Sequence, residues 1–376
     1  MGRGGEIYMD TSFNLVYPKG TNQLFDIPEE VMPVISKHWA QFPPSHPLIP
    51  HVFGILFFFL WIINFVGNGL VIFIFLKTKS LRTPTNFFVV NLAFSDFVMM
   101  STMGLPVTVN AFVQRYWMWG VFGCQVYAMI GAICGTTSIL TMVVIGYDRY
   151  NVIVKGFSGV KINAPKALLI LICIWGYSTV VSMMPFFGWG GYMAEGLLVT
   201  CGYDYLSQEW NRRSYMMFAF SFNYMLPLSL IGFFYTKIVK AVVMHEAALK
   251  AQAKKMNVDS LRSNADEAKE SAEVRIAKVA ITNVLLWVCI WSPYAIVNLI
   301  GVFGNQIIIT PLVSQIPAFV AKTACCLNPL VYAISHPKYR EALSREVPCL
   351  GITEKSAAAA AAKAADGGTD SVQTKA

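Results

Sequence analysis

The sequence predicts an all-α protein, a bundle of seven transmembrane helices followed by a short amphipathic eighth helix on the cytoplasmic side. Of its 376 residues, 55% are hydrophobic and only 13% are charged, about half the charged fraction of a typical soluble domain. The apolar residues gather in seven segments, each long enough to cross a bilayer. Lysine and arginine concentrate in short loops between these segments, which is the positive-inside pattern of a membrane protein.

The net charge of +8 on its own would also suit a nucleic-acid-binding protein. Because the basic residues follow the loops, however, we expect membrane lipids and no nucleic acid as the surroundings. The first fifty residues are polar and contain several prolines, so we predict no cleavable signal peptide and expect the first helix to direct insertion. The predicted regions are an extracellular tail (1–50), the bundle with its eighth helix (51–347) and a disordered cytoplasmic tail (348–376).

The first predicted span covers residues 52–76 and the second covers 86–112. Each carries a polar side chain at membrane depth, Asn68 in the first span and Asp96 in the second. Polar groups are costly there unless they find partners, so we expect an internal polar network in which Asp96 bonds to Asn68 and to Asn328. The loop between the two spans is basic and is placed in the cytoplasm.

The third span, residues 124–147, ends in Asp148-Arg149-Tyr150. As a tripeptide this is an ordinary helix-end charge cluster, but its position at the cytoplasmic end of a third span gives it weight. The fourth span covers 167–187. A loop outside the membrane follows at 188–213; it is rich in glycine and aromatic residues and contains Glu195, Cys201 and Asp204.

The fifth span, residues 215–243, contains Tyr235 and leads into a charged, alanine-rich stretch at 244–275. On pattern alone this stretch is a solvated extension of the helix. The sixth span, 276–303, contains Trp291-Ser292-Pro293-Tyr294. A bulky indole beside a proline kink predicts a hinge in this helix.

The seventh span, residues 311–335, has a single charged residue, Lys322, near its middle. One interpretation is structural, with Lys322 paired to an acid on a neighbouring helix. The other is chemical, because burial favours the neutral amine and this is the form that condenses with an aldehyde. The motif Asn328-Pro329-Leu330-Val331-Tyr332 follows, and its proline should kink the helix.

This combination resembles the seventh helix of an opsin, whose lysine carries retinal as a Schiff base above an Asn-Pro-x-x-Tyr motif. The resemblance covers nearly the whole chain and is strongest to arthropod visual opsins, in particular those of spiders. Residues 244–275 resemble the third cytoplasmic loop of arthropod and cephalopod visual opsins that couple to the Gq class.

The resemblance implies a light-sensing receptor, not an enzyme, that holds 11-cis-retinal on Lys322 and activates a Gq-type G protein when light converts the chromophore to all-trans. It also implies partners of two further kinds, arrestin and a receptor kinase. The expected location is the rhabdomeric plasma membrane, crossed several times, with the N-terminus outside. The residues expected to act in G-protein coupling are Asp148, Arg149, Tyr150, Tyr235, Asn328, Pro329 and Tyr332.

We also expect a disulfide on the extracellular side and a surface helix after the seventh span. Cys124 and Cys201 both fall on the extracellular side, which is oxidising, and we expect a disulfide between them, in agreement with opsins. After the seventh span, a basic amphipathic segment from His336 to about Val347 is predicted to lie on the membrane surface, with Cys349 as a lipidation site.

A retinal attached to Lys322 as a protonated Schiff base needs a negative partner. Vertebrate pigments place the acid three residues after the conserved cysteine, where this chain has Tyr127, and amine receptors place one at Gly131. The third span holds no acid before Asp148. Glu195, six residues before Cys201, matches the loop glutamate that serves invertebrate opsins as counterion. Tyr127, Gly131, Trp291 and Tyr294 are expected to line the chromophore site.

Three other functions are compatible with parts of this pattern. A retinal photoisomerase would use the same lysine and acid but would not signal, and Asp148-Arg149-Tyr150 together with the Gq-like loop argue against it. A non-visual retinal-binding opsin would share the site. A receptor for a diffusible ligand would lack a visible absorption band after addition of retinal, which separates it from an opsin.

Overall fold

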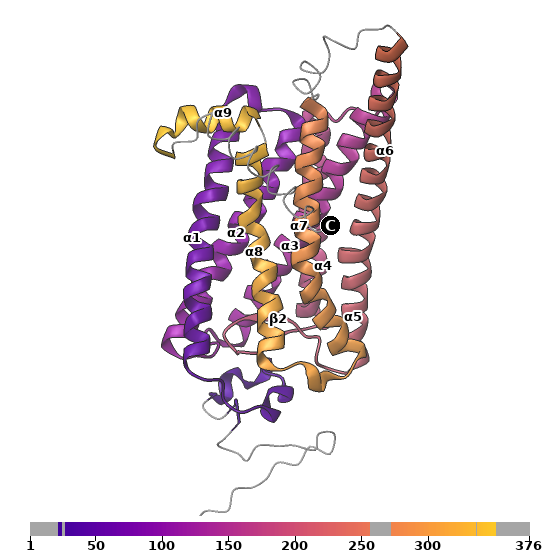
Figure 1. Cartoon of the computed structure of the whole chain (residues 1–376). Helices are drawn as coiled ribbons and strands as arrows, with labels where there is room; N and C mark the ends of the chain where they lie inside the picture. The colour runs from indigo at the N-terminus through magenta and orange to yellow at the C-terminus, as the bar shows by residue number, and fades with distance from the viewer. Residues whose placement is uncertain (1–21, 25–26, 256–271, 336, 351–376) are drawn as a thin grey trace, which may run out of the picture.

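The computed structural model describes residues 22–24, 27–255, 272–335 and 337–350. In this part of the chain, helical segments run side by side as a bundle (Figure 1). Six segments are long and apolar enough to cross a membrane, and the seventh, α8, has 25 residues, or about 37 Å at 1.5 Å per residue. The helices of the bundle are α1 (Leu48–Lys77), α2 (Pro84–Val113), α3 (Gly120–Tyr150), α4 (Ala164–Met183), α5 (Trp210–Phe220), α6 (Leu226–Lys255), α7 (Ala272–Phe303) and α8 (Pro311–Ser335).

The predicted seven-helix architecture is confirmed, and the seventh span has the bounds that the sequence indicated. The fifth span differs, because it is divided into α5 and α6 by a π-helical turn, η7 (Ser221–Met225). Pro227 has no backbone N–H for the carbonyl four residues earlier, so the hydrogen-bond ladder is already interrupted at this point. α6 then continues beyond the predicted end to Lys255.

The loop after α4 folds into a short hairpin that the sequence did not predict. Strand β1 (Tyr192–Ala194) pairs antiparallel with β2 (Cys201–Tyr203), with Tyr192 opposite Tyr203 and Ala194 opposite Cys201. We call this side of the bundle the hairpin end. The expected disulfide joins Cys201 to Cys124 in α3, with 5.5 Å between the Cα atoms, and so ties the hairpin to the third helix.

Two 3₁₀ helices from the N-terminal tail, η1 (Glu29–Val34) and η2 (Lys37–Gln41), pack over the hairpin end. Trp39 is fully buried and donates a hydrogen bond from Nε1 to the Ala194 carbonyl at 3.3 Å. Burial lowers the pKa of His38; its Nε2 lies 2.8 Å from the Ile309 carbonyl. The tail thus clamps both the hairpin and the segment before α8.

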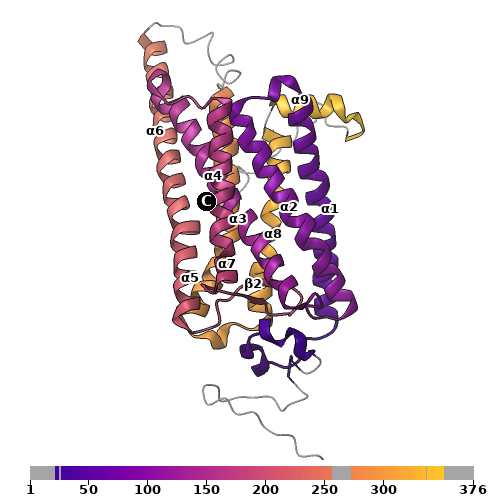
Figure 2. The ribbon, with the colours of Figure 1, turned by 180° about the vertical axis from the view of Figure 1, so that it is seen from behind.

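The eighth helix is present as α9 (Pro337–Glu346), at the opposite end of the bundle from the hairpin. We call this side the α9 end. Figure 2 shows this arrangement from the back of the molecule. Tyr339 stacks on Phe75 of α1, with 5.4 Å between the ring centroids, and Lys77 pairs with Glu346 at 2.6 Å. The hydrogen bonds from Lys77 and Arg345 lower the pKa of Glu346. These contacts hold α9 against α1.

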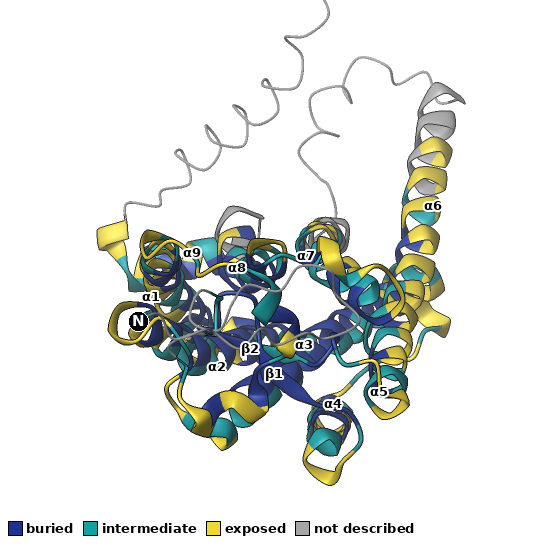
Figure 3. Cartoon of the chain, turned by 90° about the horizontal axis from the view of Figure 1, so that it is seen from below, coloured by how far each residue is buried: buried dark blue, intermediate teal, exposed yellow. Residues whose placement is uncertain are grey.

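Burial in this bundle suits a lipid surrounding. Strand β1 is dark blue between the helices in Figure 3, while the outer faces of α1, α4 and α6 are exposed. These exposed faces are apolar, with side chains such as Phe59, Leu169 and Phe233 more than half or about half exposed. Apolar residues that face outward in this number are a liability in water and an advantage in a bilayer.

Candidate functional site

Lys322 lies in the middle of α8 and its side chain points into the bundle. It is 7% exposed. Its Nζ donates to the Ala318 carbonyl one turn earlier at 3.3 Å and lies 5.9 Å from the ring centroid of Phe57 in α1. Among the described residues, no ion pair within 4.0 Å includes Lys322. It therefore lacks the ion pair that a purely structural buried lysine would need.

A cavity opens beside this amine. The centre of a water molecule can move through about 140 Å³ of it, roughly ten times the 10–15 Å³ that one enclosed water needs. Side chains from α2, α3, the hairpin, α5, η7, α7 and α8 form its walls, and most of them are apolar. Among the residues predicted for the site, the cavity is lined by Gly131, Glu195, Trp291, Tyr294 and Lys322.

The hairpin forms one wall of the cavity and supplies its carboxylate. Glu195 directly follows β1 and is 2% exposed. Its Oε2 accepts a hydrogen bond from the Thr200 hydroxyl at 2.8 Å, while Oε1 is buried without a hydrogen-bond partner in the described structure. Burial raises the pKa of Tyr203, on the same wall, so this phenol stays neutral.

Gly202 explains how the carboxylate can lie so close to α7. A Cβ at Gly202 would overlap Glu195 Oε1 and would come within 2.7 Å of the Tyr294 hydroxyl oxygen. Real Cβ atoms essentially never show such contacts. The absence of a side chain at this position is what allows Glu195 and Tyr294 to meet at the cavity wall.

Asp204, the other acid of this loop, is engaged elsewhere. Its Oδ2 lies 3.5 Å from Nε of Arg212, and its Oδ1 accepts from the Ser207 amide at 3.0 Å. Asp204 does not line the cavity. The structure thus separates the two candidate acids, with Glu195 at the cavity and Asp204 paired with Arg212.

Of the α3 and α7 residues predicted for the site, Gly131, Trp291 and Tyr294 line the cavity, whereas Tyr127 does not. Tyr127 is buried; its ring packs edge-on against Trp117, and its hydroxyl has no partner within the described chain. Trp291 stacks on Trp287, with 5.4 Å between the ring centroids, and a Cβ at Gly135 of α3 would lie 3.3 Å from its indole. Gly131 makes room for Met103, whose Cε would lie 2.8 Å from a Cβ there.

These features fit a long, apolar ligand that forms one covalent or ionic contact at its end. An amine and a carboxylate lie on one cavity, and the remaining walls are aromatic or aliphatic. Glu195 Oε1 and the Tyr127 hydroxyl are buried polar atoms for which the described residues offer no partner, and such atoms are costly unless something else bonds to them. A retinoid aldehyde has this combination of an apolar chain and a reactive end.

A separate polar network lies deeper in the bundle. Asp96 accepts hydrogen bonds from Asn328 at 2.5 Å and from Ser138 at 3.2 Å. Asn68 does not bond directly to Asp96 as expected; it donates instead to the Cys325 carbonyl at 2.9 Å. Cys325 belongs to α8, so the network still links α1, α2, α3 and α8 near Pro329.

At the α9 end, four of the residues predicted for coupling lie around the end of α3, namely Asp148, Arg149, Tyr150 and Tyr235, whereas Asn328 belongs to the Asp96 network. Arg149 forms an ion pair with the neighbouring Asp148, which also accepts from Thr85 of α2 at 3.1 Å. The ring of Tyr150 packs against Phe234 of α6. Tyr235 is buried, and no described group bonds to its hydroxyl. The side chain of Tyr332 lies outside the described residues, as do the side chains of residues 249–280; Cys349 is exposed.

Three residues of the site were not predicted from the sequence: Thr200, Gly202 and Gln315. Thr200 and Gly202 flank Cys201, so the disulfide could have drawn attention to them. Gln315 lies seven residues before Lys322, close to two helical turns, which places both side chains on one face of α8. Nothing in the sequence indicated that the hairpin would insert between the helices and contact this face of α8.

Comparison with known proteins extends these observations. The model of the family described as 7 transmembrane receptor (rhodopsin family) matches residues 67–332. The compound eye opsin BCRH2 of Hemigrapsus sanguineus is 46% identical over 349 residues, which cover 92% of each chain. The lateral eye opsin of Limulus polyphemus is 45% identical over 340 residues, or 90% of each chain. The crystal structure of squid rhodopsin aligns with a TM-score of 0.77 and 39% identity, covering 84% of this chain and 90% of that one.

Proposed function

Since this chain belongs to the rhodopsin family of seven-transmembrane receptors, as a visual opsin with a retinal chromophore and a G-protein partner, we propose that Lys322 binds 11-cis-retinal as a Schiff base and that Glu195 is its counterion. The observation that carries this proposal is the placement of a buried amine, which forms no ion pair with a described residue, on an apolar cavity that also holds a buried carboxylate. Retinal, when bound, would supply absorption of visible light and a change of shape.

The residues of the chain would each have a part. The Lys322 amine, kept from water by α1 and α8, would attach the aldehyde. Glu195 lines the same cavity as Lys322, so this carboxylate can stabilise a cation at the amine. Trp291 and Tyr294 would shape the cavity along α7. A change in the shape of the ligand would then favour a different arrangement of the bundle.

We further propose that the hairpin end is extracellular and that the α9 end faces a Gq-type G protein in a rhabdomeric photoreceptor membrane. Basic residues of the loops at the α9 end support this orientation through the positive-inside rule; they include Lys77, Lys79, Arg82, Lys155 and Lys161. The Asp148–Arg149 pair would be released on activation, and the resemblance to other visual opsins leads us to expect arrestin and a receptor kinase as further partners.

Attachment is tested by Lys322→Ala, with Lys237→Ala on α6 as the matched control. Each variant is incubated with 11-cis-retinal, its spectrum is recorded, and the sample is reduced with borohydride for peptide mapping. We expect Lys322→Ala to lose the visible band while still reaching the membrane, and Lys237→Ala to keep it. A visible pigment in Lys322→Ala, or a reduced retinyl group on another peptide, would overturn the proposal.

Coupling is tested by Arg149→Gln and by alanine replacement of the lysines within residues 250–255, at the end of α6. Both should reduce light-driven nucleotide exchange on a Gq-type G protein and leave the dark spectrum unchanged. Lys37→Gln, an exposed charge at the hairpin end, is the control. Parent-like exchange in both variants would place the coupling surface elsewhere.

A further inference from the structure

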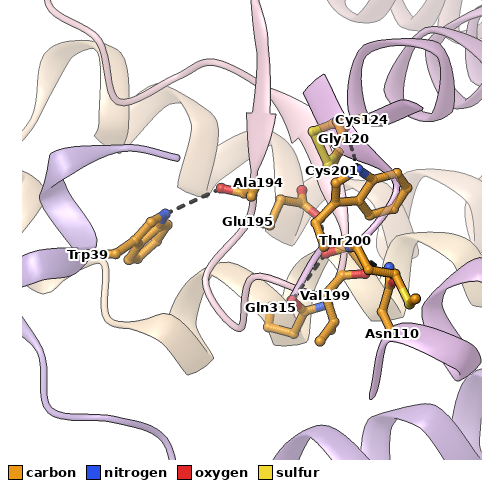
Figure 4. The surroundings of a disulfide bond; sticks show 12 residues. Trp39, Asn110, Gly120, Cys124, Ala194, Glu195, Val199, Thr200, Cys201 and Gln315 are labelled. Atoms are coloured by element: carbon orange, nitrogen blue, oxygen red, sulfur yellow. Dashed lines mark hydrogen bonds between the residues drawn. A yellow bond between two sulfur atoms is a disulfide. The ribbon is translucent and has the colours of Figure 1, made fainter. Parts of the chain in front are cut away.

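The start of α8 contributes two adjacent polar side chains that bond to the hairpin. Ser314 and Gln315 are both fully buried. The Ser314 hydroxyl oxygen accepts from the Gly196 amide at 3.0 Å and lies 2.7 Å from the Tyr205 hydroxyl. Gln315 bonds through its side-chain amide to the Thr200 hydroxyl at 3.2 Å. The first residue holds the hairpin turn, whereas the second reaches the side chain that bonds to Glu195 (Figure 4).

The hydrogen-bond inventory of this group determines which way the amide of Gln315 points. As placed, the Thr200 hydroxyl would donate both to Glu195 Oε2 and to Gln315 Oε1, but a hydroxyl has only one proton. The Gln315 Nε2 is meanwhile buried with no partner among the described residues. Oxygen and nitrogen of an amide can be exchanged without changing its shape. Exchanging them removes the conflict, since Nε2–H then donates to Thr200 Oγ1 and the hydroxyl proton remains for Glu195 Oε2, while the carbonyl oxygen takes the position without a described partner.

We infer that Gln315 is a positioning residue for the Glu195 carboxylate, acting through Thr200; this inference rests on the proposed role of Glu195 as counterion. Gln315 donates to Thr200, so the single proton of Thr200 is directed to Glu195 Oε2. The carboxylate is then held at Oε2 by Thr200, while Oε1, which has no hydrogen-bond partner among the described residues, lies beside the Tyr294 hydroxyl. Because Gln315 and Lys322 lie on one face of α8, the same helix positions the amine and the acid that serves it.

The test compares the pH titration of two pigments regenerated with 11-cis-retinal, the parent and Gln315→Met. This substitution keeps the length of the side chain and removes the amide. We expect the pH midpoint at which the visible band gives way to an ultraviolet band to fall by about half a unit to one unit, because a hydrogen bond that fixes a charged group is lost. Ser314→Ala is the matched control: it also removes a buried bond to the hairpin, and its midpoint should remain that of the parent. The melting temperature of each retinal-free protein reports loss of stability separately.

Thr200 provides a second pair of variants should Gln315→Met fail to fold. Thr200→Val should lower the pH midpoint of the visible band. Thr200→Ser, which keeps the hydroxyl, should have the midpoint of the parent. An unchanged midpoint in Gln315→Met, or in Thr200→Val, would overturn the inference. So would an equal fall in Ser314→Ala, since the effect would then come from loosening the hairpin.

A double variant distinguishes the failure of this inference from the failure of the counterion proposal. If Gln315 acts through Glu195, adding Gln315→Met to Glu195→Gln should change the midpoint no further. A further fall in the double variant equal to that in Gln315→Met alone would overturn the inference and leave the counterion intact. A parent-like midpoint in Glu195→Gln alone would instead remove the counterion proposal on which the inference rests.

Discussion

Replacing Glu195 by glutamine removes the carboxylate that lines the cavity while keeping the shape of the side chain. In the regenerated pigment, the negative charge favours the protonated form of the retinal linkage on Lys322. Loss of that charge disfavours the cation, so its proton should leave at a lower pH. We therefore expect Glu195→Gln to absorb in the ultraviolet at a pH at which the parent still absorbs visible light.

The size of this effect can be bounded from the structure. Two unit charges 4 Å apart attract each other by about 4 kcal/mol at an effective dielectric constant of 20, which corresponds to about 3 pH units. The described structure has no ion pair within 4.0 Å between Lys322 and Glu195, so this is an upper bound. We expect the midpoint of the visible band to fall by about one to three pH units.

The assay is a pH titration of the visible band in darkness, with Asp204→Asn and Asp96→Asn as charge-matched controls. Asp204 is paired with Arg212, and Asp96 bonds to Asn328, so neither loss should move the midpoint as far. Tyr127→Phe should produce a smaller change than Glu195→Gln, because a phenol carries no charge at neutral pH. The reasoning is refuted if Glu195→Gln titrates like the parent while one of the aspartate variants absorbs in the ultraviolet.

Three further predictions concern the hairpin and its cap. Gly202→Ala should destabilise the retinal-free protein by about 1–3 kcal/mol through overpacking against Glu195, measured by thermal melting; a parent-like melting temperature would contradict the crowding. Cys201→Ala removes the disulfide between residues 77 apart in sequence, which should lower the free energy of unfolding by up to about 4.5 kcal/mol. Dithiothreitol should destabilise the parent, which has the disulfide, but not the variant. His38 has a folded-state pKa below 6.5, so its contribution to stability is present above pH 6.5 and is lost as the pH falls through the folded-state pKa. Acidification should therefore lower the melting temperature of the parent more than that of His38→Gln, and equal slopes would exclude His38 as the cause.

Much of the fold could be predicted from the sequence because a bilayer restricts the chain so strongly. Backbone groups in lipid must bond within their own segment, so seven long apolar segments could only be helices. The bounds of α8 were predicted to the residue, since Pro311 begins the helix and the apolar run ends at Ser335. The disulfide between Cys124 and Cys201 was also predictable, because both cysteines flank spans on the same side of the membrane.

The site was only partly accessible to the same reasoning. Lys322 could be singled out because a charge at membrane depth needs an explanation. The third span has no acid before Asp148, which left Glu195 and Asp204, and the resemblance to invertebrate opsins favoured Glu195. The direct contact expected between Asn68 and Asp96 was not found, since polarity alone does not say which of several buried partners an amide will choose. The π-helical turn η7 was likewise missed, because Pro227 shows where the ladder is interrupted but not how the helix compensates.

The sequence by itself therefore determined the membrane-spanning helices and the buried amine, and it narrowed the candidate acids of the loop to Glu195 and Asp204. Only the tertiary structure decided that the hairpin dips between the helices, that Gly202 lets Glu195 approach Tyr294, and that Gln315 reaches Thr200. The physical reason is the range of the forces involved. Insertion into a bilayer depends on composition summed along each segment, whereas a hydrogen bond depends on atoms brought within about 3 Å from segments more than a hundred residues apart.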